Sequence, residues 1–292
     1  MNKSMKWGNW GLAVLAFLAS IAVQFIAAFI VILPTSFMIG IQMGMEGITD
    51  PKQVEQMTME AMNDVLPTTI VVTHLLLLVT FSMWYYFGCG RPSLKKVPFA
   101  RIFCPKYFIA MLLIAVGFNV FTNYGLSLIF PLIPESIVKN YEAMMEQAGF
   151  GESILATISA VLIAPFGEEF IYRGVVFSYT KKAVSGMRNR RRAFWIANCV
   201  QALLFGVFHL NIIQGAYAFC LGLVLGYLAY RFDSILPAIF GHMIFNGFST
   251  LAIEPISVMI PESTLSYAIV VVISAVVAIG GFVLAGPKKE NI

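Results

Sequence analysis

The sequence predicts an all-α, polytopic membrane protein with about eight transmembrane helices and both termini in the cytoplasm. Of its 292 residues, 59% are hydrophobic and 12% are charged, whereas a soluble domain carries about 25% charged residues. Eight apolar runs are long enough to cross a hydrocarbon layer, which needs about 20 residues per helix. The loops between these runs alternate between basic and acidic composition, which predicts their orientation.

The predicted spans follow one another through the chain. The first, residues 10–33, is too long for the apolar core of a signal peptide, about 7–15 residues, so we expect it to be retained. The other seven lie at 68–88, 107–130, 153–179, 193–210, 212–230, 234–253 and 265–285. We divide the chain into N-terminal membrane helices (1–150), a core of four spans (151–253), and a final span with a cytoplasmic tail (254–292).

Lysine and arginine concentrate in alternate loops. Apart from Arg173, the only basic residues outside the N-terminus, 89–107, 180–192, 231–233 and the C-terminal tail are Lys52 and Lys139. Positive residues favour the cytoplasm, so these loops and both termini are expected there. Because the basic residues lie in short loops and form no folded basic face, we expect no nucleic-acid partner.

Two of the acidic outer loops carry apolar residues at helical spacing, over 54–65 and 137–148. Each is expected to form a short amphipathic helix on the outer surface.

The sixth span carries Gly215, Ala218, Gly222 and Gly226, a stripe of small residues that permits close helix packing. We find no internal repeat, which counts against a secondary transporter.

Three ionisable residues lie inside the fourth span, in the stretch APFGEEFIYRG. Placing an ionisable residue inside a membrane span costs about 3 kcal/mol or more, so such a residue indicates a functional site. Glu169 and Arg173 are i and i+4 with the acid first, which favours an ion pair. Glu168 is rotated about 100° away and is left free to act. Alternatively, all three pair with one another and stabilise a kink, and Pro165 and Gly167 are expected to loosen the helix there.

Two histidines lie in other apolar spans, and each has a motif residue one helical turn away on the same face. His209 follows Phe205 by one turn in FGVFH, and His242 precedes Asn246 by one turn in GHMIFN. A lone buried histidine is usually a core residue, but two of them together with a spare buried glutamate indicate a site. His74, in VVTHLLLL, has no such company and is expected to be structural.

These motifs resemble a known family. EExxxR at 168–173, FxxxH at 205–209 and HxxxN at 242–246, in this order on separate spans, resemble the CAAX protease and bacteriocin-processing (CPBP) family of intramembrane proteases, also called the ABI or type II CAAX prenyl endopeptidase family. The resemblance covers about residues 150–250. It implies peptide-bond hydrolysis, with the predicted core as its catalytic core.

The resemblance also implies roles for the residues in the motifs. Glu168 with His209 would activate a water, and His242 with Asn246 would stabilise the oxyanion or join in holding the water. The supporting residues would be Glu169, Arg173 and Phe205.

The family is labelled as metalloproteases, and two chemistries stay open. Zinc held by Glu168, His209 and His242 would keep a fourth position for water; a metal-free, glutamate-activated water needs no such ligand set. The cofactor is therefore either none or zinc. Because His242 has Asn246 one turn away, which suits an oxyanion site, we expect the three side chains to converge on a cavity open to the cytoplasm without an ion.

The expected partners are the lipid bilayer and a membrane-associated peptide or protein substrate, such as a CAAX-type protein, a bacteriocin or pheromone precursor, or an immunity-related substrate. Short loops favour a prokaryotic cytoplasmic membrane. Two alternatives remain. Buried Glu and His also suit a membrane transporter or channel, and the same fold could belong to a catalytically silent bacteriocin immunity protein, although the full motif set argues against lost activity.

Overall fold

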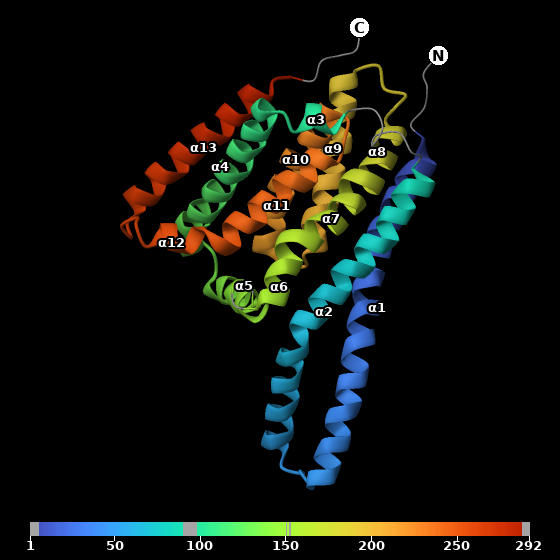
Figure 1. Cartoon of the computed structure of the whole chain (residues 1–292), viewed down its shortest axis with the longest axis vertical. Helices are drawn as coiled ribbons and strands as arrows, with labels where there is room; N and C mark the ends of the chain where they lie inside the picture. Colours follow the sequence, from blue (N-terminus) through green and yellow to red (C-terminus); the bar gives the residue numbers. More distant parts are fainter. Residues whose placement is uncertain (1–5, 90–97, 150, 152, 288–292) are drawn as a thin grey trace.

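The computed structural model describes residues 6–89, 98–149, 151 and 153–287, and within them the chain is all-helical, as predicted (Figure 1). The helices are α1 (Trp7–Glu46), α2 (Pro51–Gly88), α3 (Phe99–Ile102), α4 (Pro105–Ile129), η1 (Phe130–Leu132), α5 (Glu135–Gln147), α6 (Ile154–Ile158), η2 (Ser159–Ile163), α7 (Ala164–Glu169), η3 (Phe170–Val176), α8 (Phe177–Ala183), α9 (Arg190–Phe208), α10 (Ile212–Phe232), α11 (Leu236–Leu251), α12 (Ile253–Ser257) and α13 (Thr264–Ala285).

Six helical segments in the described part of the chain are long and apolar enough to cross a membrane: Trp7–Glu46, Pro51–Gly88, Pro105–Leu132, Ile154–Ala183, Ile212–Phe232 and Thr264–Ala285. The predicted spans 193–210 and 234–253 correspond to α9, which begins with three arginines, and to α11, which has 16 residues. Sixteen residues make a helix of about 24 Å, short of a hydrocarbon layer of about 30 Å. The count of eight therefore stays a prediction.

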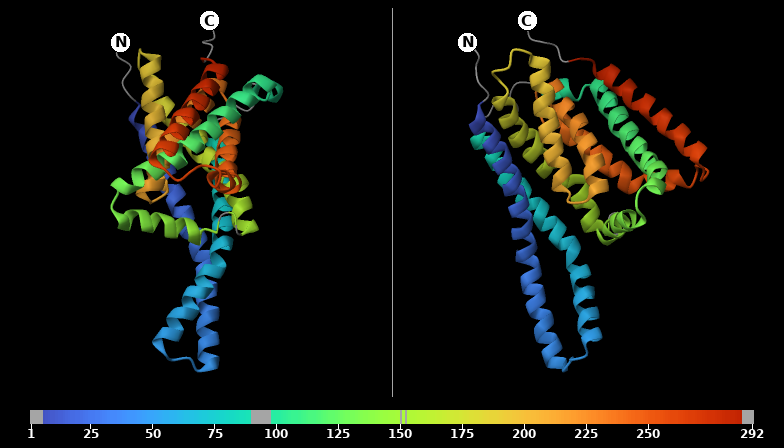
Figure 2. Two further views of the ribbon diagram at one scale, coloured as in Figure 1. Left: turned by 90° about the vertical axis from the view of Figure 1, so that its left-hand side faces the viewer. Right: turned by 180° about the vertical axis from the view of Figure 1, so that it is seen from behind.

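The first two helices form a hairpin that projects far beyond the other helices (Figures 1 and 2). With 40 residues, α1 is about 60 Å long, roughly twice the hydrocarbon thickness. The prediction of a separate short helix over 54–65 was wrong, because these residues are the first turns of α2. The side chain of Asp50 caps that helix, and Pro67 lies within it without ending it. The helix predicted over 137–148 is confirmed as α5, and its place on the outer surface stays a prediction.

The small residues of α10 pack directly against α9, as predicted. A Cβ atom on Gly222 would lie 2.9 Å from Ala202 Cβ, and one on Gly226 would overlap Asn198 Oδ1. Buried polar side chains then join the two helices. Asn198 donates to the Leu223 carbonyl at 3.0 Å, and Gln201 donates to the Gly222 carbonyl at 2.9 Å. The glycines thus bring backbone carbonyls within reach of polar groups that would otherwise be unsatisfied in the bundle.

The last helix packs against α4, again through glycine. A Cβ atom on Gly117 would lie 2.7 Å from the Ala278 nitrogen, and one on Gly281 would lie 2.8 Å from the Ala110 carbonyl oxygen. Within the described residues, α4 is also tied to α11 by a buried hydrogen bond from Asn119 to the Phe245 carbonyl, at 2.9 Å. These contacts cross the boundaries of the predicted three-part division of the chain. The division itself stays a prediction.

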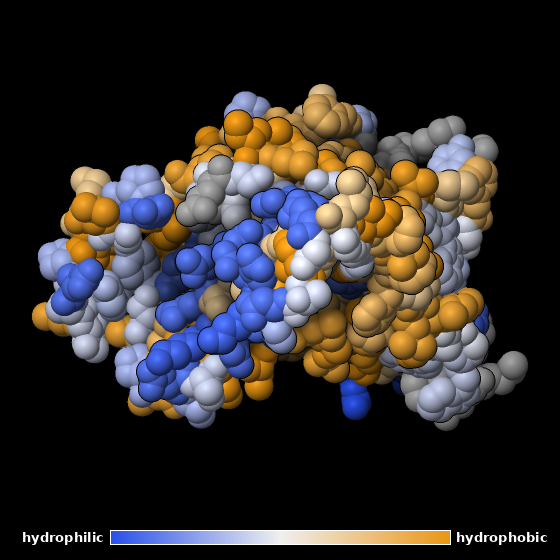
Figure 3. Space-filling model, turned by 90° about the horizontal axis from the view of Figure 1, so that it is seen from below, coloured by the Kyte–Doolittle hydropathy of each residue, from blue (hydrophilic) through white to orange (hydrophobic). Residues whose placement is uncertain are grey.

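The start of α1 and the end of α13 lie at the same end of the molecule, and α5 and the tip of the hairpin lie toward the other (Figure 1). Viewed from the hairpin end, hydrophilic residues gather in the middle and apolar residues surround them (Figure 3). The cytoplasmic location of both termini stays a prediction.

We expect Gly226→Ala to destabilise the protein, because the added methyl would overlap the amide of Asn198. Overpacking of this kind costs about 1–3 kcal/mol. Gly280→Ala is the matched control, since no atom lies within 4 Å of a Cβ placed there. Thermal unfolding in detergent should show a lower midpoint for the first variant alone, and equal midpoints would contradict the close packing of α9 and α10.

Candidate active site

The segment that carries Glu168 and Glu169 is not a regular α-helix. The π-helical turns η2 and η3 lie on either side of α7, and Pro165 stands in the first turn of α7. Such π-helical turns are rare and occur frequently at functional sites. The predicted loosening of this helix near Pro165 and Gly167 is therefore present. Gly167 has a second role, because a Cβ there would lie 3.4 Å from the backbone oxygen of His74, so α2 passes close by.

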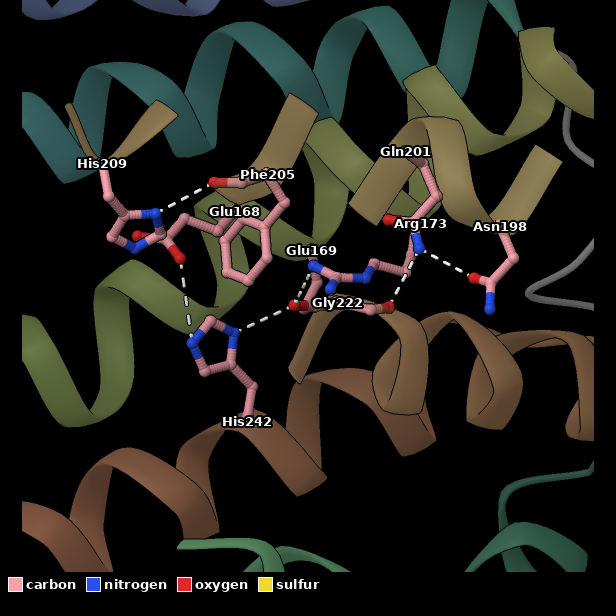
Figure 4. Close-up of polar contacts among 9 residues, drawn as sticks. All are labelled: Glu168, Glu169, Arg173, Asn198, Gln201, Phe205, His209, Gly222 and His242. Carbon is pink, nitrogen blue, oxygen red and sulfur yellow. Dashed lines mark hydrogen bonds and ion pairs between the residues drawn. The ribbon is translucent and has the colours of Figure 1, made fainter. Parts of the chain in front are cut away.

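Glu169 joins a residue one turn further along its own helical segment to a residue of α11 through one oxygen atom. Its Oε1 lies 2.8 Å from Nη1 of Arg173 and 2.9 Å from Nδ1 of His242 (Figure 4). All three residues are buried. The predicted ion pair between Glu169 and Arg173 is confirmed. The same carboxylate also holds His242, a contact that the sequence motifs do not predict.

The hydrogen bond to Glu169 fixes how His242 is turned. A carboxylate only accepts, so Nδ1 carries the proton, and Nε2 points toward Glu168 (Figure 4). Nε2 lies 3.7 Å from Oε2 of Glu168, which is too long for a hydrogen bond. Glu168 thus faces His242 with its carboxylate still available to another group.

His209 is held in a similar way at the C-terminal end of α9. Its Nδ1 donates to the Phe205 carbonyl at 2.9 Å, which leaves Nε2 as an acceptor in the neutral ring. The Phe205 ring meets the ring of His209 edge-on at 5.0 Å, and the guanidinium of Arg173 lies 4.5 Å from its centre. Phe205 thus contacts both His209 and Arg173, which agrees with the supporting role predicted for it.

The predicted residues line one cavity of about 380 Å³. Glu168, His209, His242 and Asn246 all contribute to its wall, from three separate helical segments. Asn246 donates one amide hydrogen to the Ala160 carbonyl of η2 at 2.9 Å, and its second amide hydrogen is left for a group in the cavity. The fold therefore brings together all four residues of the predicted site.

The cavity also contains residues that the sequence analysis missed. His74, predicted to be structural, lines it from α2, and its Nδ1 lies 2.8 Å from the hydroxyl of Ser159. Gln24 of α1 lines it too, with a buried Nε2 that has no hydrogen-bond partner in the described structure. The only sequence feature that could have indicated His74 or Gln24 as a cavity residue is that each is a polar residue within a predicted span.

Glu168, His209 and His242, the residues of the alternative zinc site, all line the cavity. Among the described residues, no group of three or more His, Cys, Asp or Glu side chains lies close enough to hold a metal ion. Nδ1 of His242 donates to Glu169 and Nδ1 of His209 donates to the Phe205 carbonyl, which leaves Nε2 of each ring free, as in histidines that bind a metal. Zinc requires its ligand atoms at about 2.0–2.2 Å from one point, and Nε2 of His242 lies 3.7 Å from Oε2 of Glu168. The choice between zinc and a metal-free water stays a prediction.

The cavity extends toward the end of the molecule that holds α5. Met144, Met145 and Ala148 of α5 line it, as do Leu210 after α9 and Thr250 near the end of α11. The start of α1 and the end of α13 lie at the opposite end (Figure 1). The prediction of cytoplasmic termini and the prediction of a cavity open to the cytoplasm are therefore at odds.

Comparison with known proteins gives one family. Residues 150–248 match the family model described as type II CAAX prenyl endopeptidase, Rce1-like. These residues, about a third of the chain, are therefore similar to that protease family. Searches of the curated proteins and of the solved structures gave no match. The matched segment carries the three sequence motifs, and the apolar helices of the described chain fit an integral membrane protein.

We expect Glu169→Gln to lower both stability and activity. The change removes the charge that pairs with Arg173 and weakens the acceptor that orients His242, and breaking a buried pair costs about 3–5 kcal/mol. Glu168→Gln, the same change one residue earlier, breaks no hydrogen bond to a described side chain. Thermal unfolding of the two variants side by side should show a large loss for the first only; equal losses would contradict the assignment.

Proposed function

We propose that the protein is an intramembrane endopeptidase that hydrolyses a peptide bond of a membrane-associated peptide or protein through a water activated by Glu168 and His209. The observation that carries the proposal is the position of Glu168. It is a buried carboxylate in the wall of a cavity, it has no hydrogen bond to a described side chain, and two histidines from other helices line the same cavity.

Attack on the peptide begins with the water. Oxygen of the Glu168 carboxylate and Nε2 of His209 are both acceptors, so together they take the two hydrogens of one water and direct its lone pair into the cavity. Glu168 removes a proton as the water oxygen bonds to the carbonyl carbon, and the C=O electron pair moves to the oxygen. When the C–N bond breaks, Glu168 returns that proton to the leaving amine.

The developing oxyanion needs hydrogen-bond donors of its own. The second amide hydrogen of Asn246 is one donor, because the first is already bonded to the Ala160 carbonyl. His242 is the other when its ring carries protons on both nitrogens, a state in which Nδ1 keeps its hydrogen bond to Glu169. Fixed donors of this kind contribute about 2.7–4 kcal/mol each to transition-state stabilisation.

The volume of the cavity also limits the length of substrate that it can hold. A volume of about 380 Å³ lies at the lower end of the range of small-ligand sites, about 300–1,000 Å³, and it takes a short extended stretch of polypeptide. CAAX-type proteins, bacteriocin or pheromone precursors and immunity-related proteins all supply such a stretch at the membrane. We propose that the protein works in a prokaryotic cytoplasmic membrane and that hydrolysis proceeds without a metal, despite the family's metalloprotease label.

The proposal is tested with the purified protein in lipid nanodiscs, a peptide library and mass spectrometry. We expect cleavage by the parent, a loss of about 10²–10⁴-fold in Glu168→Gln, and no loss in the control Glu142→Gln on the exposed part of α5. Activity should persist in a strong chelator. Full activity of Glu168→Gln would rule out the proposed base, and activity that is lost in chelator and restored by zinc would rule out the metal-free route.

A further inference from the structure

The projecting half of the α1–α2 hairpin is a surface with no partner in the described structure. Residues 31–70 contain no buried side chain, although all but the connection 47–50 belong to the two longest helices. Because α1 is about twice as long as a hydrocarbon layer is thick, one half of the hairpin lies outside that layer. Exposed apolar residues there are not explained by contact with lipid tails.

This half of the hairpin combines acidic and apolar side chains. Phe37, Met38, Met45 and Met59 are between 58% and 84% exposed. The acidic residues of the same region, with Lys52 as the only base among them, are Glu46, Asp50, Glu55, Glu60 and Asp64. None of these five forms an ion pair with another described residue. Glu55 and Met59 are one turn apart on the same face of α2.

A surface of this composition fits one kind of partner. Flexible methionine side chains adapt to varied apolar partners, and a negative field selects against a second copy of the same acidic hairpin. We propose that residues 35–66 are a docking surface for a cationic amphipathic segment of polypeptide, which lays its apolar face on the methionines and its basic residues against the acids.

The surface leads directly to the candidate active site. Ile70 and His74, which line the cavity, lie on α2 itself. Asp64 is six residues from Ile70 on this continuous helix, a distance of about 9 Å. A segment docked on the hairpin therefore has its next residues at the cavity mouth. The inference deepens the proposed function by naming a cationic amphipathic polypeptide as substrate, and it depends on that function only for the claim that the docked chain is cut.

The test measures binding in the absence of cleavage. Full-length Glu168→Gln protein in nanodiscs of zwitterionic lipid is titrated with a fluorescent Leu/Lys amphipathic peptide, and empty nanodiscs serve as the blank. Adding Glu55→Gln and Glu60→Gln should weaken binding about tenfold, and raising the salt concentration should weaken it as well. A Leu/Glu peptide of equal length should not bind.

The matched control is Glu254→Gln with Glu262→Gln, which removes the same charge from exposed residues at and just after α12, away from the hairpin (Figure 1). It should change the affinity by less than about twofold. Equal affinity of both double variants, or binding of the Leu/Glu peptide, would overturn the docking surface. Failure of the parent to cut any peptide would overturn the proposed function alone, because the binding measurement uses protein that lacks the base.

Discussion

The arrangement of the site depends on one carboxylate oxygen, Oε1 of Glu169. A buried acid must be paired and hydrogen-bonded to be tolerated in an apolar bundle, and this one is paired with Arg173 and bonded to His242. Arg173 then lies over the ring of Phe205, whose backbone carbonyl orients His209. Both histidines are thus positioned, directly or through Phe205, by a residue that does not face the cavity.

Glycine and π-helical geometry allow these contacts to form. The turns η2 and η3 displace the backbone around α7, and one of the carbonyls in η2 accepts from Asn246. Gly167 lets α2 approach closely enough for His74 to reach the cavity. The small residues of α10 do the same for α9, which carries Phe205 and His209. Irregular backbone is tolerated at membrane depth only where protein or a cavity surrounds it, and both conditions are met here.

Much of this was predictable from spacing along single helices. The ion pair of Glu169 with Arg173, the stripe on α10 and the helix α5 all follow from a period of 3.6 residues. The contact of Glu169 with His242 joins residues 73 positions apart, and no local pattern encodes it. His74 was assigned a structural role for the same reason. The length of α2 was missed because its polar first half reads as a loop, although Asp50 and Pro51 form a good helix start.

The most direct test of the shared carboxylate is the tautomer of His242. Nitrogen-15 NMR of histidine-labelled protein in detergent, with His242→Gln to assign the signal, reports which ring nitrogen carries the proton. We expect a protonated, hydrogen-bonded Nδ1 in the parent and loss of this state in Glu169→Gln. An unprotonated Nδ1 in the parent, or an identical signal in both proteins, would contradict the account.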